Sequence, residues 1–117
     1  MHGSPDAVDA AERTELAATV VIPSALVGFA GGRSHIRVAL EETPAESDEP
    51  RSPLSAVLDR LGREVPALER RIRDERGRVR GHVNIYVDGV DIRELGGVQT
   101  VIVPGASVHI IAAVSGG

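Results

Sequence analysis

Residues 82–117 read HVNIYVDGVDIRELGGVQTVIVPGASVHIIAAVSGG, and three segments of this stretch have the composition or the period-two pattern of β-strands. In the first segment, alternation turns Val83, Ile85 and Val87 toward a core. In the last segment, Val108 and Ile110 take the same orientation. A glycine or proline turn follows each of the first two segments. The predicted strands are therefore 82–87, 99–103 and 107–113.

Upstream of these strands the sequence predicts an amphipathic helix. Apolar residues recur at three- and four-residue steps from Leu54 to Ile72, which places them on one stripe. Ser52-Pro53 reads as an N-cap followed by a proline at the first helical position. Pro66 lies inside the stripe, so a kink or a restart is expected there. The opposite face is charged and includes Arg60, Arg63, Glu64, Glu69, Arg70 and Arg73.

Two further strands are predicted near the N-terminus. Thr19–Ile22 is rich in β-branched residues and stops at Pro23, while Ser34–Leu40 alternates between apolar and other residues. The connection Val27–Arg33 contains three glycines, which is typical of a turn. The two strands are therefore expected to form an antiparallel hairpin.

The order of these elements is two strands, one helix and three strands. A single apolar helix stripe can form a core only by covering one face of a sheet. We therefore predict an α+β fold of the β-grasp type over 18–113, in which one main helix crosses a mixed sheet of four to five strands. The returning strands are expected to complete that one sheet. The residues predicted to be buried are Val20, Ile22, Ile36, Val38, Leu54, Val57, Leu58, Leu61, Val83, Ile85, Val108 and Ile110.

Three segments have little to bury and are expected to be flexible. They are an acidic N-terminal extension, 1–17, an acidic loop, 41–52, and a Gly-Gly tail, 114–117.

Composition excludes several classes of protein. The 117 residues suffice for one domain, and 13 basic against 17 acidic residues give a net charge of −4, which argues against nucleic acid as a partner. The chain has no cysteine, and every basic residue is an arginine, so Cys-ligated metals and lysine Schiff bases are excluded. The histidines have no metal-ligand spacing, so no metal site is expected.

No segment has the roughly 18 uninterrupted apolar residues of a membrane span, and the N-terminus lacks the regions of a signal peptide. A cytoplasmic protein without a membrane partner is expected.

The last residues suggest a chemical role. After the final strand the sequence ends Ala113-Val114-Ser115-Gly116-Gly117. Two glycines have no Cβ and can enter a channel that admits only backbone. An unhindered carboxylate on such a thin stalk is suited to activation in another protein's active site. The alternative is a frayed end of small residues.

The segment from His82 to Gly117 resembles the ubiquitin-like sulfur carriers of the MoaD/ThiS superfamily, with the greatest similarity to the CysO-type branch of cysteine biosynthesis. The resemblance rests on VNIYVDG, on the DIR-x-L-x-G-V-x-T segment, and on the closing strand that runs into Ala-Val-small-Gly-Gly. The segments VVIPSAL and Pro53–Leu61 match more loosely. The acidic extension and loop, Ala112 and Ser115 depart from the branch's usual pattern.

The resemblance implies a carrier that is not an enzyme and binds no cofactor. An E1-like enzyme would use ATP to adenylate the Gly117 carboxylate, and a sulfur donor would convert the adenylate to a thiocarboxylate. Gly116, Ser115 and Val114 would form the stalk. The sulfur would then attack an activated serine held by a cysteine synthase, and a metallopeptidase would release cysteine.

Other functions remain open from the sequence. The chain can be the small subunit of a molybdopterin synthase, a protein modifier joined through Gly117 to lysines of its targets, or a β-grasp adaptor without tail chemistry. A carrier must also dock on its activating enzyme, and alternation places Tyr86, Ile111 and Ala113 on the sheet face away from the helix. These residues are either a docking patch or an edge of the core.

Overall fold

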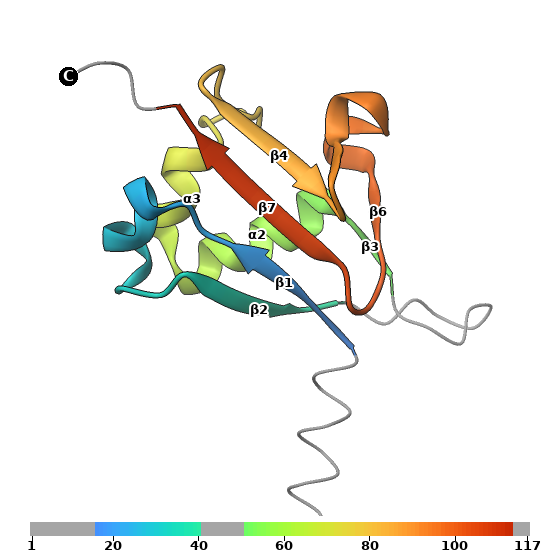
Figure 1. The fold of residues 1–117 in the computed structure, drawn as a ribbon, viewed down its shortest axis with the longest axis horizontal. Helices are drawn as coiled ribbons and strands as arrows, with labels where there is room; N and C mark the ends of the chain where they lie inside the picture. Colours follow the sequence, from blue (N-terminus) through green and yellow to red (C-terminus); the bar gives the residue numbers. More distant parts are fainter. Residues whose placement is uncertain (1–15, 41–50, 114–117) are drawn as a thin grey trace, which may run out of the picture.

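The computed structural model describes residues 16–40 and 51–113. The main sheet has five strands in the order β2-β1-β7-β4-β5. Strand β1 pairs in parallel with β7, and all other neighbours pair antiparallel. Figure 1 shows β7 between β1 and β4, with the helices packed against the sheet. The strand bounds are β1 Ala17–Val21, β2 His35–Ala39, β4 Val83–Val87, β5 Val90–Asp91 and β7 Ser107–Ala112.

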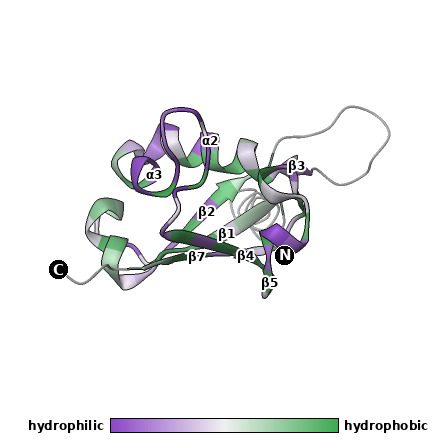
Figure 2. Ribbon diagram, turned by 90° about the horizontal axis from the view of Figure 1, so that it is seen from above, coloured by the Kyte–Doolittle hydropathy of each residue, from purple (hydrophilic) through white to green (hydrophobic). Residues whose placement is uncertain are grey.

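The helix stripe covers one face of this sheet. The stripe is divided between α2, Leu54–Glu64, and α3, Pro66–Ile72, with Val65 in a non-helical conformation between them. The predicted restart at Pro66 is confirmed, because proline takes the first position of α3. Both helices lie on the same side of the sheet in Figure 2.

The predicted core and fold class are also confirmed. Every residue predicted for the core is buried, and Leu54, Leu58 and Leu61 of α2 are fully inaccessible to solvent. The mixed five-stranded sheet covered by helices is the predicted β-grasp arrangement.

Two local predictions are wrong. Ser52-Pro53 does not cap the helix through Ser52; it forms the short strand β3, and α2 begins without a side-chain cap. Strand β3 pairs with β6, Val101–Ile102, in a separate two-stranded sheet, so the predicted strand 99–103 does not join the main sheet. Ser52 is buried, and the Leu54 N–H donates to the Thr100 carbonyl, so this small sheet ties the start of α2 to the returning chain.

The connections also contain short 3-10 helices. The predicted turn after β1 is largely η1, Ser24–Ala30, which ends at Gly31 with a φ of 66°. Two more follow β5, namely η2, Ile92–Glu94, and η3, Gly97–Gln99. The predicted turn at Asp88-Gly89 is confirmed; both residues have positive φ, 50° and 89°, as the two-residue hairpin between β4 and β5 requires.

The predictions of flexibility fall mainly outside the described residues. Of the segment 1–17, Ala17 belongs to β1, and of the loop 41–52, Ser52 belongs to β3. The segments 1–15, 41–50 and 114–117 are not described. In the described part of the chain, no helix is long and apolar enough to cross a membrane.

Arg73 belongs to the charged face of the predicted helix, and its charge predicts a solvated position, but the structure buries it, with its side chain 8% exposed. Its Nη2 donates to Asp59 Oδ1 at 2.7 Å, and its Nε donates to Glu69 Oε2. Burial by itself lowers the pKa of Arg73, but the hydrogen bonds to Asp59 and Glu69 outweigh this, and the pKa is raised. The ion pairs therefore hold the C-terminal end of α3 against α2.

Replacing Arg73 with methionine is expected to lower the free energy of unfolding by about 1–2 kcal/mol, because Glu69 loses a charged hydrogen-bond donor. Methionine keeps most of the apolar stem, so the loss reports the ion pairs rather than packing. Urea unfolding measures the effect. The exposed Arg63 of α2, changed to methionine, is the control and should shift stability by less than about 0.5 kcal/mol. Equal stability of the two variants would contradict a stabilising role for the pairs.

Candidate functional site at the root of the C-terminal tail

The tail leaves the domain from its central strand. Strand β7 is paired on both sides, with β1 and with β4. Beyond the end of β7, the Ala113 N–H donates to the His82 carbonyl at 2.8 Å. Strand β1 pairs with residues 107–109 of β7, while β4 pairs with residues 108–112, so the root of the tail is held by β4 and by this bond to His82. The predicted site residues Val114, Ser115, Gly116 and Gly117 lie outside the described residues.

The outer face of the sheet, opposite the helices, holds the residues predicted for docking. In β7, Val108 and Ile110 point into the core, so alternation turns Ile111 outward, where it is 46% exposed. Ala113 is exposed and Tyr86 is half-buried. The structure thus brings these three residues to one face, as predicted from alternation. Their role in docking stays a prediction.

The strand register extends this face into a row of side chains across the sheet. Tyr86 pairs with His109 on one side and with Asp91 on the other. His109 pairs in turn with Val21, and Val21 with His35. Only Tyr86 of this row could be predicted from alternation, because the other members become its neighbours only through strand pairing.

An ion pair borders the row at β5. Arg93 Nη2 donates to Asp91 Oδ2 at 2.6 Å, and the Arg93 backbone N–H donates to Asp91 Oδ1, which caps η2. These side-chain and backbone hydrogen bonds lower the pKa of Asp91. The border of the outer face therefore carries a fixed, paired charge, and its centre carries Tyr86 and Ile111.

The described residues contain no cluster of three or more His, Cys, Asp or Glu side chains able to hold a metal ion. His35, His82 and His109 come from three different strands or their ends, and none belongs to such a cluster. The described part of the site consists of an exposed sheet face and a firmly held tail root, features that suit recognition by another protein.

Comparison with known proteins identifies the family. The model of the ThiS family matches residues 35–117, which is more than half of the chain. The sulfur carrier protein CysO of Mycobacterium tuberculosis is 35% identical over 101 residues, covering 85% of this chain and 97% of the relative. The CysO of Mycobacterium bovis matches equally well.

Solved structures agree with this match. The crystal structure of Mycobacterium tuberculosis CysO has a TM-score of 0.64 and 33% identity, covering 83% of this chain and 99% of that one. A chain in the crystal structure of the Amycolatopsis orientalis BexX/CysO complex has a TM-score of 0.66 and 25% identity, covering 86% and 99%. Members of this family are carriers acted on by partner enzymes, and they bind no cofactor. With the five-stranded β-grasp sheet and a tail rooted on its central strand, the chain belongs to the ThiS family and is a sulfur carrier protein of the CysO-like type.

Proposed function

We propose that this carrier holds sulfur as a thiocarboxylate on Gly117 and donates it in the biosynthesis of cysteine or a related sulfur metabolite. The observation that supports the proposal most is the family match, which runs through Gly117 and so includes the Gly-Gly end. The similarity to proteins named as CysO carriers favours the cysteine branch. The paired root at Ala113 supports it as well, because it holds the tail's starting point.

The proposed loading has two steps. A Gly117 carboxylate oxygen attacks the α-phosphate of ATP, and pyrophosphate leaves. A sulfide-equivalent nucleophile then attacks the acyl carbon, AMP leaves, and a terminal C(=O)S⁻ remains. Adenylation is needed because a free carboxylate has no adequate leaving group. The ATP is bound by the activating enzyme, so the carrier itself needs no cofactor.

The partners follow from these steps. An E1-like enzyme would activate and load Gly117, a cysteine synthase would present an activated serine to the sulfur, and a metallopeptidase would release the product. The Amycolatopsis structure, in which a CysO is in complex with BexX, shows one CysO-type protein bound to a partner. We propose that the reaction takes place in the cytoplasm, where ATP is available.

Transfer to an acceptor tests the cysteine assignment. The carrier, loaded with sulfur, is mixed with a cysteine synthase and an activated serine, and its intact mass is followed. The expected product carries one added cysteinyl residue at Gly117. Loss of the sulfur without that addition, or transfer to a molybdopterin precursor instead, would contradict the cysteine branch. Attachment to target lysines would indicate a protein modifier.

The outer face gives a second prediction. Ile111→Arg is expected to lower kcat/KM for loading by about tenfold or more, because a cation replaces an apolar contact at a protein interface. Folding should be unaffected, since Ile111 is 46% exposed. Steady-state loading kinetics and thermal unfolding measure the two effects. The matched control is Val101→Arg, because Val101 is 55% exposed but lies in β6, outside the main sheet. An equal decrease in kcat/KM for loading in both variants would contradict docking through the outer face.

A further inference from the structure

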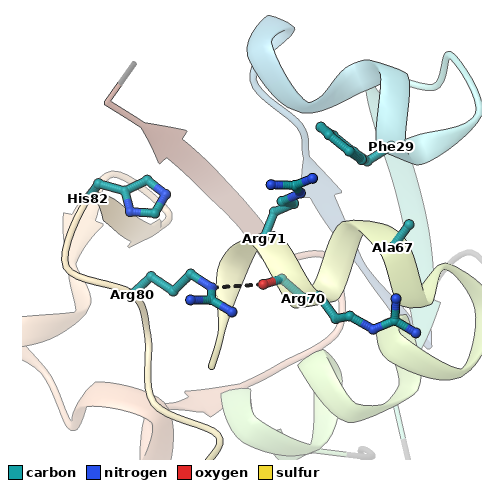
Figure 3. Close-up of a pocket in the computed structure, with 6 residues that line it drawn as sticks. All are labelled: Phe29, Ala67, Arg70, Arg71, Arg80 and His82. Atoms are coloured by element: carbon teal, nitrogen blue, oxygen red, sulfur yellow. Dashed lines mark hydrogen bonds between the residues drawn. The ribbon is translucent and has the colours of Figure 1, made fainter. Parts of the chain in front are cut away.

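A cationic pocket lies beside the tail root, on the helix side of the sheet. It has a volume of about 350 Å³ and is lined by Phe29, Ala67, Arg70, Arg71, Arg80 and His82. Figure 3 shows that these residues come from η1, from α3 and from the segment just before β4. The pocket therefore joins three segments that are separated in the sequence.

Two arginines of the pocket are held in place by neighbours. Arg80 Nε donates to the Arg70 carbonyl at 2.8 Å, the contact drawn in Figure 3. The Arg71 guanidinium lies 4.3 Å from the centre of the Phe29 ring. A cation over an aromatic face is stabilised without losing its charge. The guanidiniums are therefore positioned while they stay able to bind an anion.

No carboxylate of residues 16–40 or 51–113 lines the pocket. Among the described residues, salt bridges occupy Arg73, Arg78 and Arg93, and none involves Arg70, Arg71 or Arg80. Arg70 and Arg80 also border a neighbouring pocket, whose lining includes the carboxylates of Asp59, Glu69, Asp74 and Glu75. None of these carboxylates lines the cationic pocket itself, so three arginines without a described ion pair face it in a chain of net charge −4, which points to an anionic ligand.

The position of the pocket limits what that ligand is. His82 lines the pocket, and its carbonyl accepts the hydrogen bond from Ala113. Four residues, 114–117, can reach at most about 14 Å beyond Ala113, so under the proposed function the active site that receives Gly117 lies within that distance of the tail root. The pocket then meets the protein surface around the mouth of the channel that receives the tail. The tail, rather than the pocket, would reach the nucleotide at the far end of such a channel, so the position of the pocket favours an anionic surface of the enzyme as its ligand.

We propose that the pocket of Arg70, Arg71, Arg80 and His82 binds an acidic segment of the activating enzyme at the mouth of its tail channel. This proposal rests on the proposed function. Carboxylates of that segment pair with the guanidiniums, whose fork geometry matches a carboxylate. Phe29 and Ala67 provide apolar surface for the aliphatic parts of the same segment.

The pocket affects the binding of the carrier to the activating enzyme rather than the loading reaction itself. Charges at the rim of an interface speed up encounter and set its salt dependence. They lie outside the reacting atoms, so kcat is unaffected. Salt at 1 M shortens the Debye length to about 3 Å and removes most of the effect.

The test uses the full-length double variant Arg70→Glu/Arg71→Glu. Both side chains are exposed, so folding is retained, which thermal unfolding checks. The expected result at low salt is an increase of about tenfold or more in KM for loading and in Kd for the enzyme measured without ATP, with kcat unchanged. The difference from wild type should shrink at 1 M salt. The variant Arg70→Gln/Arg71→Gln should have KM and Kd values between those of wild type and those of the double glutamate variant.

The matched control is Arg63→Glu/Arg76→Glu, which reverses as many exposed charges without touching the pocket. Its KM and Kd should change by less than about twofold. Equal Kd for the pocket variant and wild type would overturn the proposal, as would a pure loss of kcat. More efficient loading by the pocket variant would also overturn it, because the pocket would then hold the chain's own terminal carboxylate.

The two readouts separate this proposal from the proposed function. If wild type binds the enzyme but gains no sulfur, and the pocket variant binds more weakly, docking holds and the sulfur chemistry fails. If wild type is loaded and the Kd is unchanged in the variant, the chemistry holds and the pocket proposal fails.

Discussion

Extending the chain by one residue beyond Gly117 is expected to abolish sulfur loading while leaving the fold intact. The extra residue moves the terminal carboxylate about 3.5 Å further along an extended backbone. Attack on the α-phosphate of ATP requires close alignment, and a displacement of about 1 Å can cost ~100-fold in rate. Gly116→Val is expected to have a similar effect, because a branched Cβ would enter the proposed channel, which is expected to fit backbone only. Intact mass after incubation with ATP, the activating enzyme and a sulfur donor measures loading.

The controls for this prediction separate chemistry from stability. One residue added before Met1 should leave loading unchanged. Both tail variants leave every described core residue unchanged, so the free energy of unfolding is expected to change by less than about 0.5 kcal/mol. Normal loading of the uncleaved, extended protein would contradict carriage on the terminal carboxylate and would favour an adaptor without tail chemistry.

Leu58→Ala is expected to cost about 3 kcal/mol of folding free energy, the largest stability effect we predict. Leu58 lies at the centre of the α2 stripe and is fully buried. Its truncation loses apolar burial and leaves a cavity that a packed core fills only in part. For a domain of this size the midpoint of thermal unfolding should fall by roughly 10 °C.

Ile111→Ala is the matched control for the core. It removes a similar apolar side chain from the outer face, where 46% of the residue is exposed. Its stability should change by less than about 0.5 kcal/mol. A large loss of stability in Ile111→Ala together with a small loss in Leu58→Ala would contradict the assignment of the two sheet faces.

The core and the main sheet could be predicted because side-chain periodicity reports burial directly. The α2–α3 stripe and the alternation in 82–87 each identify one apolar face, and all predicted core residues are buried. The pairing of Ser52-Pro53 with Val101–Ile102 could not be predicted, because a two-residue strand is too short to show a period. The same proline that forms part of β3 reads locally as the start of a helix.

The site was only partly predictable for a related reason. Alternation brings Tyr86 and Ile111 to one face, but His35, Val21 and His109 join them only through strand register. The cationic pocket unites η1, α3 and the start of β4, so no single stretch of sequence shows it. The burial of Arg73 could not be predicted, because its charge predicts a solvated position, whereas Asp59 and Glu69 make its burial tolerable.

The most direct test of sulfur carriage at Gly117 is a mass measurement on the end of the chain. Trypsin cuts after arginine, and the last arginine is Arg93, so the C-terminal fragment is 94–117. After incubation with ATP, the activating enzyme and a sulfur donor, fragmentation of this peptide should locate a gain of about 16 Da, one oxygen exchanged for sulfur, on Gly117. The gain should be absent without ATP. An unchanged fragment, or a gain located on any other residue, would contradict the account.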